Sequence, residues 1–591
     1  MYNLVVITSR KLNRNGGVMY LDFLIKIPDV PGKIARQRKK GVVYIDYEYS
    51  REYLPEKQYT NPRRVTIGKQ VVDDETMMQP NQNYLLYFPD VPLPEEKSGE
   101  RRSSCLRTGA FIVIRRIMEA YKLPEILTKY LGEKDTGLFL DLAAYSIICE
   151  NNAGQYYPDY AYNHPLFTKG MKIYSDSKVS DFLSGITDDQ SVGFLNEWNA
   201  KKDHREKIYI TYDSTNKNCQ AGDIEIVEYG RAKKDLGLPV FNYSIAYDTY
   251  NREPLFYEEY PGSIVDISQL QFMLEKAVGY GYKRAGFILD RGYFSKENIR
   301  YMDKCGYDFV IMVKGMSGLV NGLVLENKGK FENKRECGIR EYKAYGMTVR
   351  RQMFESDETE RYFHLFHSSG KESKERETIE ANMEKMAKYL ERLEGKTLSS
   401  PAVYEKYFKL FFDKERKDVK EADRVFLFAK ERASVIEQEI DLCGYFVIVT
   451  SEKMTAKEAL SLYKSRDASE KLFRGDKSYL GNKSLRVHSD ESAAAKIFVE
   501  FIALIVRNKM YTCLKDEMAK NDNKANYMTV PAAIRELEKI EMVKMLDKKY
   551  RLDHAVTAIQ KAILKAFGMD AGYIKNKTNE ISAMLQVKEE E

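Results

Sequence analysis

Four side chains within residues 463–477 have the types and the spacing of a site that handles phosphate. At roughly 100° per residue, one stripe of a helix about 60° wide collects all four of them: Tyr463, Arg466, Glu470 and Lys477. A glutamate on such a stripe is able to bind a divalent metal ion while its cationic neighbours hold a polyanion. A solvated helix face is the alternative interpretation, because charged helices are common.

Two aspartates lie upstream, where apolar strands are expected to end. Asp213 closes the run 208–213, and Asp290 closes the run 285–290. Two such strands bring their carboxylates together at a sheet edge, and like charges there are costly unless a cation lies between them. Taken singly, each aspartate is more simply explained as a turn or helix-cap residue.

The order of three acids on strand, strand and helix favours metal chemistry over unrelated caps. If Glu470 lies on a helix over the sheet, it completes an oxygen-ligand site suited to Mg²⁺ or Mn²⁺. Two such ions, about 4 Å apart, activate a water and stabilise the leaving oxygen of a phosphodiester during an in-line displacement.

This set of residues resembles insertion-sequence transposases of the DDE class, in the subgroup with a Tyr-x2-Arg-x3-Glu-x6-Lys signature and a ribonuclease H-like catalytic core. The matching stretches are Asp-Ser-Thr at 213–215, Asp-Arg-Gly-Tyr-Phe at 290–294 and the four signature residues of 463–477. The resemblance implies that Asp213, Asp290 and Glu470 hold two metal ions. Water would nick the element end, and the freed 3′-hydroxyl would attack DNA again.

The same resemblance implies contacts and partners. Tyr463, Arg466 and Lys477 match phosphate-contacting positions, and Arg291 is a weaker candidate for the same work. The implied partner is double-stranded DNA, both element ends and target. A homodimer holding paired ends is the expected working form, and the bacterial cytoplasm, at the nucleoid, is the expected location.

Two features depart from the family pattern. Gly475 lies between Glu470 and Lys477 and favours an early end to the helix, which would place Lys477 on a loop. The single tryptophan, Trp198, precedes the core, so an aromatic residue from 316–440 would have to stack a flipped base if a DNA hairpin forms.

Basic charge is concentrated near the N-terminus. Residues 1–70 hold 14 Lys and Arg against 6 Asp and Glu, whereas the whole chain has a net charge of only +6. Cations on turns and short strands are well placed to contact DNA phosphates, although a solubilising surface is the alternative. The candidates are Arg36, Arg38, Lys39, Lys40, Arg63 and Arg64.

Hydrophobic periodicity predicts an α/β fold with a mixed sheet flanked by helices, and the resemblance implies that this sheet is ribonuclease H-like. Turn signals and changes of pattern divide the 591 residues into six segments. They are a basic strand-and-loop module (1–104), a helical region (105–206), the first half of the catalytic core (207–315), a β-rich insertion (316–440), the second half of the catalytic core (441–520) and a C-terminal helical region (521–591).

Composition argues against several other classes of protein. The longest apolar run, 497–506, is interrupted by Glu500 and is too short to cross a bilayer, and the N-terminus lacks the pattern of a signal peptide. The seven cysteines include no Cys-x-x-Cys pair, so a zinc site is not indicated and a reducing compartment is expected.

Two functions besides an active transposase stay open. One is a catalytically silent DNA-binding protein derived from such an enzyme, against which the three intact acids argue. The other is a stand-alone nuclease on the same fold, which would cleave DNA without joining the cleaved end to a target.

Overall fold

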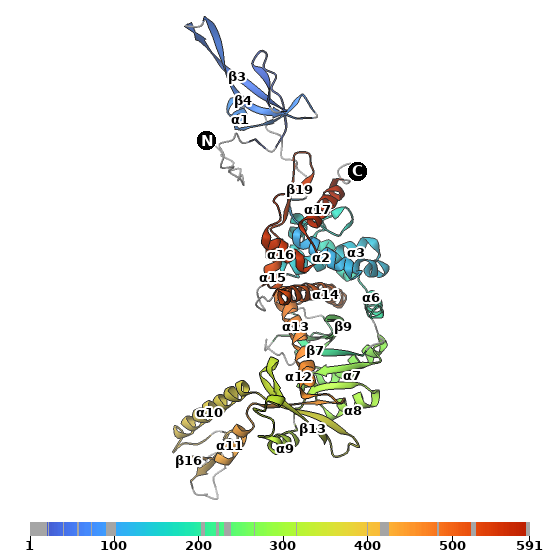
Figure 1. The fold of residues 1–591 in the computed structure, drawn as a ribbon, viewed down its shortest axis with the longest axis vertical. Helices are drawn as coiled ribbons and strands as arrows, with labels where there is room; N and C mark the ends of the chain where they lie inside the picture. Colours follow the sequence, from blue (N-terminus) through green and yellow to red (C-terminus); the bar gives the residue numbers. More distant parts are fainter. Residues whose placement is uncertain are drawn as a thin grey trace. The chain divides into compact units, whose positions relative to one another are not determined.

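The computed structural model describes residues 20–586 with gaps, and the chain divides into two compact units. The gaps are residues 22, 40, 56–57, 73, 90–101, 203–206, 220–223, 230–237, 265, 315, 399, 414–424, 482–483, 488 and 522–527. Unit 1 comprises Met1–Leu106, Glu541–Asp553 and Lys575–Glu591; unit 2 comprises Arg107–Ile540 and His554–Ile574. Figure 1 shows the elements of both units.

Unit 1 contains a five-stranded antiparallel sheet in the order β1-β5-β4-β3-β2. Its elements are β1 (Ile25–Lys26), β2 (Ile34–Lys39), β3 (Val42–Leu54), β4 (Tyr59–Gln70), β5 (Met77–Pro80) and the short helix α1 (Gln82–Tyr87). Apolar residues on one face of the sheet, including Ile45, Ile67 and Met78, pack with Tyr84 of α1. A second sheet pairs β19 (Tyr550–Leu552), β18 (Glu541–Lys544) and β6 (Cys105–Arg107).

A nine-stranded mixed sheet forms the centre of unit 2, in the order β12-β13-β14-β17-β11-β10-β7-β8-β9. An antiparallel meander of β7 (Ile208–Asn218), β8 (Val240–Asp248) and β9 (Glu253–Pro261) forms one side. Next to it, β10 (Ala285–Leu289) runs parallel to β7, and β11 (Asp308–Met312) runs parallel to β10. The predicted mixed sheet flanked by helices is confirmed.

Strands from the segment expected as an insertion extend this sheet. Next to β11 lies β17 (Tyr445–Thr450), from the segment expected as the second half of the core. Beyond it lie β14 (Glu360–His367), β13 (Ala344–Gln352) and β12 (Gly338–Ile339), from the expected insertion, all joined by antiparallel pairing. Strands β17 and β13 pair with the two edges of β14, and the side chains of its C-terminal half are buried. The strands of the expected insertion therefore belong to the same sheet as β7 to β11.

The rest of the insertion has an apolar core of its own. Its elements are α10 (Ser369–Glu391), β15 (Phe408–Phe412), β16 (Phe426–Glu431) and α11 (Ala433–Asp441). Phe408 and Phe426 of the two-stranded ribbon pack with Met383 and Leu390 of α10. Figure 1 shows these helices and strands gathered beside the β13 end of the large sheet.

Helices cover the large sheet and form the rest of unit 2. They are α2 (Gly109–Ala120), α3 (Leu123–Cys149), α4 (Tyr157–Asn163), α5 (Asp176–Ser184), α6 (Asp188–Ala200), α7 (Asp266–Gly279), α8 (Lys296–Cys305), α9 (Ser317–Asn327), α12 (Ala456–Ser465), α13 (Asp467–Tyr479), α14 (Asp490–Lys520), α15 (Val530–Leu537) and α16 (Ala558–Ala566). Most of the last helix, α17 (Ala571–Gln586), belongs to unit 1. The long helix α14 is buried over most of its length and packs against α3, α13 and β9. Within the described ranges, no helix is both long enough and apolar enough to cross a membrane.

Candidate active site

The signature residues lie on and between two consecutive helices that are separated by a single residue. A capping box of Thr455 and Glu458 starts α12, and α13 follows after a single residue, Arg466. The backbone of Arg466 is itself right-handed helical, with φ −57° and ψ −26°, so the stripe continues across the junction. This geometry keeps the side chain of Arg466 on the same side as its neighbours one turn before and one turn after.

The expected early end of the helix at Gly475 does not occur. Helix α13 continues through Gly475 to Tyr479, so Lys477 lies in its last turn. A Cβ atom at Gly475 would lie 2.6 Å from Nη1 of Arg507 on α14. The end of the Arg507 side chain therefore lies directly against Gly475, and the backbone does not turn there.

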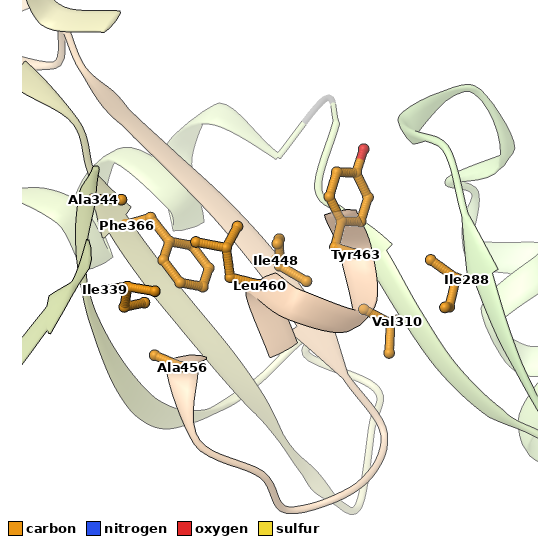
Figure 2. Close-up of a cluster of buried hydrophobic side chains, with 9 residues drawn as sticks. All are labelled: Ile288, Val310, Ile339, Ala344, Phe366, Ile448, Ala456, Leu460 and Tyr463. Carbon is orange, nitrogen blue, oxygen red and sulfur yellow. The ribbon is translucent and has the colours of Figure 1, made fainter. Parts of the chain in front are cut away.

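Tyr463 anchors the stripe to the core of the sheet. Its ring is 6% exposed and packs with Leu460, Ile288 and Val310, as Figure 2 shows, while its hydroxyl points away from this cluster. The hydroxyl donates to Oδ1 of Asp290 over 3.4 Å. Burial raises the pKa of Tyr463 to about 12, so the phenol stays a hydrogen-bond donor at neutral pH.

The two aspartates follow equivalent points on neighbouring parallel strands. The pairing of β7 with β10 ends at Tyr212 and Leu289, and the next residues are Asp213 and Asp290. Asp290 leaves the sheet and caps a short 3₁₀ turn by accepting from the backbone N–H of Arg291 over 2.8 Å. The expectation that Asp213 ends its strand is wrong.

Strand β7 continues past Asp213 to Asn218, because the residues that follow pair with β8. The polar run Ser-Thr-Asn-Lys-Asn at 214–218 hides this continuation in the sequence, since β-propensity depends on neighbouring strands as well as on residue type. Asp213 therefore projects from inside a rigid strand, with its side chain 17% exposed.

Arg466 joins all three acids. Its Nη2 donates to Oε1 of Glu470 over 2.6 Å, and its Nη1 lies 3.9 Å from Oδ2 of Asp213 and 3.8 Å from Oδ1 of Asp290. Burial opposes the charged guanidinium, but the neighbouring acids, with Asp290 first, hold the pKa of Arg466 above its usual value. The cation that the paired aspartates require is thus a side chain of the chain itself.

The three acids suit a divalent ion by type, since hard cations prefer carboxylate oxygens. Their side chains are exposed to different extents, from 17% for Asp213 to 36% for Asp290 and 52% for Glu470, so the cluster opens to solvent on the helix side. No three acid, histidine or cysteine side chains converge as a ready-made metal cage in the ranges of the chain that the structure describes. In this structure the acids surround a guanidinium.

The remaining predicted phosphate contacts lie outside this cluster. Lys477 is two turns further along α13 and is partly buried, and Arg291 is exposed immediately after Asp290. The structure thus brings Tyr463, Arg466 and the three acids together. Lys477 and Arg291 do not belong to this cluster.

A buried ion network next to the site was missed by the sequence interpretation. Nζ of Lys217, on the extension of β7, lies 3.0 Å from Oδ2 of Asp476 on α13 and 2.8 Å from Oε2 of Glu500 on α14. All three side chains are buried. Burial alone would lower the pKa of Lys217, but the two carboxylates hold it above its usual value. The one signal in the sequence was Glu500, which interrupts an apolar run.

The predicted basic residues of the N-terminal region belong to unit 1. Arg36, Arg38 and Lys39 lie on β2, and Arg63 and Arg64 lie on β4. Lys40 is outside the described residues.

Two of these arginines are already engaged by acids. Nε of Arg63 donates to Glu52 over 2.8 Å, and Nη2 of Arg64 lies 3.2 Å from the buried Glu48. Arg38 and Lys39 are exposed, so they are the more accessible pair.

Comparison with known proteins agrees with the geometry. Residues 212–506, just under half of the chain, match the family described as "Transposase DDE domain". No curated protein matches the chain significantly. Among solved structures, a piggyBac transposase synaptic complex with hairpin DNA, determined by cryo-EM, aligns with 73% of this chain and 69% of its own, at 9% identity and a TM-score of 0.29.

The matched residues contain every member of the cluster around Arg466. They begin one residue before Asp213 and extend through α13 into α14, so they span all nine strands except the first four residues of β7. The match of residues 212–506 to the transposase DDE domain supports a transposase.

Proposed function

We propose that the chain is a DNA transposase of the Tyr-Arg-Glu-Lys subgroup, which binds the terminal inverted repeats of an insertion sequence and catalyses metal-dependent strand cleavage and transfer. The proposal rests on one observation: a strand, a second strand and a helix direct Asp213, Asp290 and Glu470 onto one guanidinium, that of Arg466. These acids are far apart in sequence, so unrelated caps would have no reason to share a cation.

The three acids are proposed to hold two Mg²⁺ or Mn²⁺ ions. When bound, such ions lower the pKa of a coordinated water and neutralise charge on the phosphodiester. Asp213 is held by the strand on both sides of it, and Asp290 by its cap of the 3₁₀ turn, so their positions depend little on loop motion. Glu470 is the most exposed of the three and is proposed to complete the site from the helix.

The cations are proposed to hold the DNA backbone. A guanidinium binds a phosphate through two parallel hydrogen bonds, while lysine acts as a point charge, so Arg466 and Lys477 have different tasks. The Tyr463 hydroxyl, which donates to Asp290 in this structure, is proposed to donate to a phosphate when DNA is bound. Arg291 and the exposed cations of β2 are proposed as further contacts, in a homodimer that pairs two element ends.

The experiment measures strand cleavage and DNA binding separately on a duplex carrying the terminal repeat. We expect Asp213→Asn, Asp290→Asn and Glu470→Gln each to abolish cleavage while DNA affinity stays within a few-fold of that of the unmutated chain. Asp467→Asn is the matched control, because Asp467 is an exposed acid in the same helical turn as Glu470 that should not affect cleavage. Normal cleavage by any of the three cluster variants would overturn the catalytic assignment.

The two alternatives give different products in the same assay. A silent DNA-binding derivative would bind the terminal repeat and release no cleaved strand with Mg²⁺ or Mn²⁺. A stand-alone nuclease would cleave but would not join the free 3′-hydroxyl to a target duplex. Joined products from the unmutated chain would exclude both.

A further inference from the structure

The guanidinium of Arg466 lies where a metal ion would be attracted. Three carboxylates with a combined charge of −3 surround it, within 2.6 to 3.9 Å. Its side chain is only 13% exposed, so solvent screens these interactions weakly. A residue that serves only to contact DNA from the surface would have no need of this position.

We propose that Arg466 is a resident counter-ion that couples DNA binding to metal loading. In the DNA-free protein the guanidinium satisfies the acids and competes with divalent ions; a DNA phosphate then draws it away and leaves the carboxylates to the metal. The inference rests on the proposed function, because it assumes that these acids bind metal and that this arginine binds phosphate.

The local structure suits a side chain that moves between two partners. The guanidinium carbon lies 5.5 Å from the centroid of the Tyr463 ring, which is itself fixed in the apolar cluster, so an aromatic ring covers one side of the guanidinium and the acids flank the others. The strongest of its contacts is with Glu470, the most exposed acid, on the following helical turn. Breaking that contact exposes the guanidinium on the open side of the cluster, where a phosphate would approach.

The coupling has a definite sign. Metal and guanidinium repel each other, and they compete for the same oxygens. Whatever removes the guanidinium therefore strengthens metal binding, and by linkage metal binding strengthens the arginine's hold on phosphate. If Arg466 had only a structural role, its removal would weaken metal binding, because the three acids would move apart.

The test is a Mn²⁺ titration of the full-length protein without DNA, in which free Mn²⁺ is measured by its paramagnetic resonance signal. We expect Arg466→Gln to bind Mn²⁺ about tenfold more tightly than the unmutated chain, within the usual range of couplings between sites. Arg466→Lys, which keeps the charge, should lie between the two. Arg474→Gln is the matched control: Arg474 is an exposed cation one turn after Glu470, and its removal should leave the affinity nearly unchanged.

A second arm adds a duplex carrying the terminal repeat. Mn²⁺ affinity of the unmutated chain should rise with DNA, while that of Arg466→Gln should change much less because its competitor is already gone. The inference would be overturned if Arg466→Gln bound Mn²⁺ only as tightly as the unmutated chain or more weakly. Circular dichroism shows whether this variant is folded, and the Mn²⁺-induced shift in its melting temperature gives a second measure of binding. If neither protein binds Mn²⁺ at these acids, as judged against Asp213→Asn, the proposed function fails instead.

Discussion

Asp213 and Asp290 are neighbours because two parallel strands stop pairing at the same level. The last residues that β7 and β10 pair with each other are Tyr212 and Leu289, and each aspartate is the next residue along the chain. Two carboxylates at this point repel each other, and Arg466 offsets that repulsion from the helix above. The sheet thus determines the positions of the two aspartates, and the guanidinium of Arg466 offsets their negative charge.

The ion network around Lys217 should contribute strongly to stability. In Lys217→Met, Asp476 and Glu500 remain buried without their shared cation, so we expect the free energy of unfolding to fall by about 3–5 kcal/mol. Lys207→Met is the control: this lysine also pairs with two acids, Asp308 and Glu452, but is 30% exposed, and its loss should cost at most about 1 kcal/mol. Denaturant unfolding of both variants checks the difference. Similar midpoints for the two would contradict the importance assigned to the network.

Two substitutions of Tyr463 should distinguish the packing role of its ring from the chemical role of its hydroxyl. Tyr463→Phe keeps the buried ring and loses only a long hydrogen bond to Asp290, so we expect a stability change within about 1 kcal/mol but a cleavage rate reduced by about tenfold. Tyr463→Ala should instead destabilise the fold by about 3–5 kcal/mol through the cavity it leaves. Thermal unfolding and single-turnover cleavage measure the two effects. A Phe variant with full activity would remove the hydroxyl from the proposed site.

His364 should make stability depend on pH. It is buried between Thr348 and Thr450 in the β13-β14-β17 seam, and burial lowers its pKa to about 4, against an ordinary value of 6.5. The unfolded chain therefore takes up this proton at a higher pH than the folded one, so stability falls as pH drops from 6.5 to about 4, by roughly 3 kcal/mol in total.

A His364→Gln variant isolates this contribution, because an amide is able to bond both threonines without titrating. Its free energy of unfolding should show a correspondingly smaller decrease between pH 6.5 and 4 than that of the unmutated chain. Denaturant titrations at several pH values give the comparison. Parallel curves for the two proteins would mean that folding does not shift the pKa of His364.

The exposed cations of β2 offer a direct test of DNA contact by unit 1. Arg38→Ala should weaken DNA binding to a similar extent for all sequences and reduce the salt slope of the affinity by about 1, as expected for a single phosphate contact. Arg551→Ala removes an exposed arginine of β19 that is paired with Asp547, and should have a smaller effect. Binding isotherms at several salt concentrations distinguish them. Equal slopes for Arg38→Ala and the unmutated chain would favour a merely solubilising surface.

The sequence alone determined the residue types, the helical stripe and the class of fold. A stripe of Tyr463, Arg466 and Glu470 follows from 3.6 residues per turn, and a buried parallel strand such as β10 follows from its unbroken apolar run, because both are local properties of the chain. The predicted mixed sheet was confirmed for the same reason. The assignment of Asp213, Asp290 and Glu470 to metal stays a prediction until it is tested.

Only the tertiary structure decided what these residues touch. Pairing with β8 carried β7 past Asp213, α13 continued through Gly475 against the Arg507 side chain, and β14 joined the core sheet from a segment expected to be separate. The position of Arg466 among acids from β7 and β10, and that of Lys217 between α13 and α14, depend on contacts across long stretches of chain. Charge balance in a buried site is a property of the assembled fold, because it arises from groups that are brought within a few ångströms only when distant segments pack.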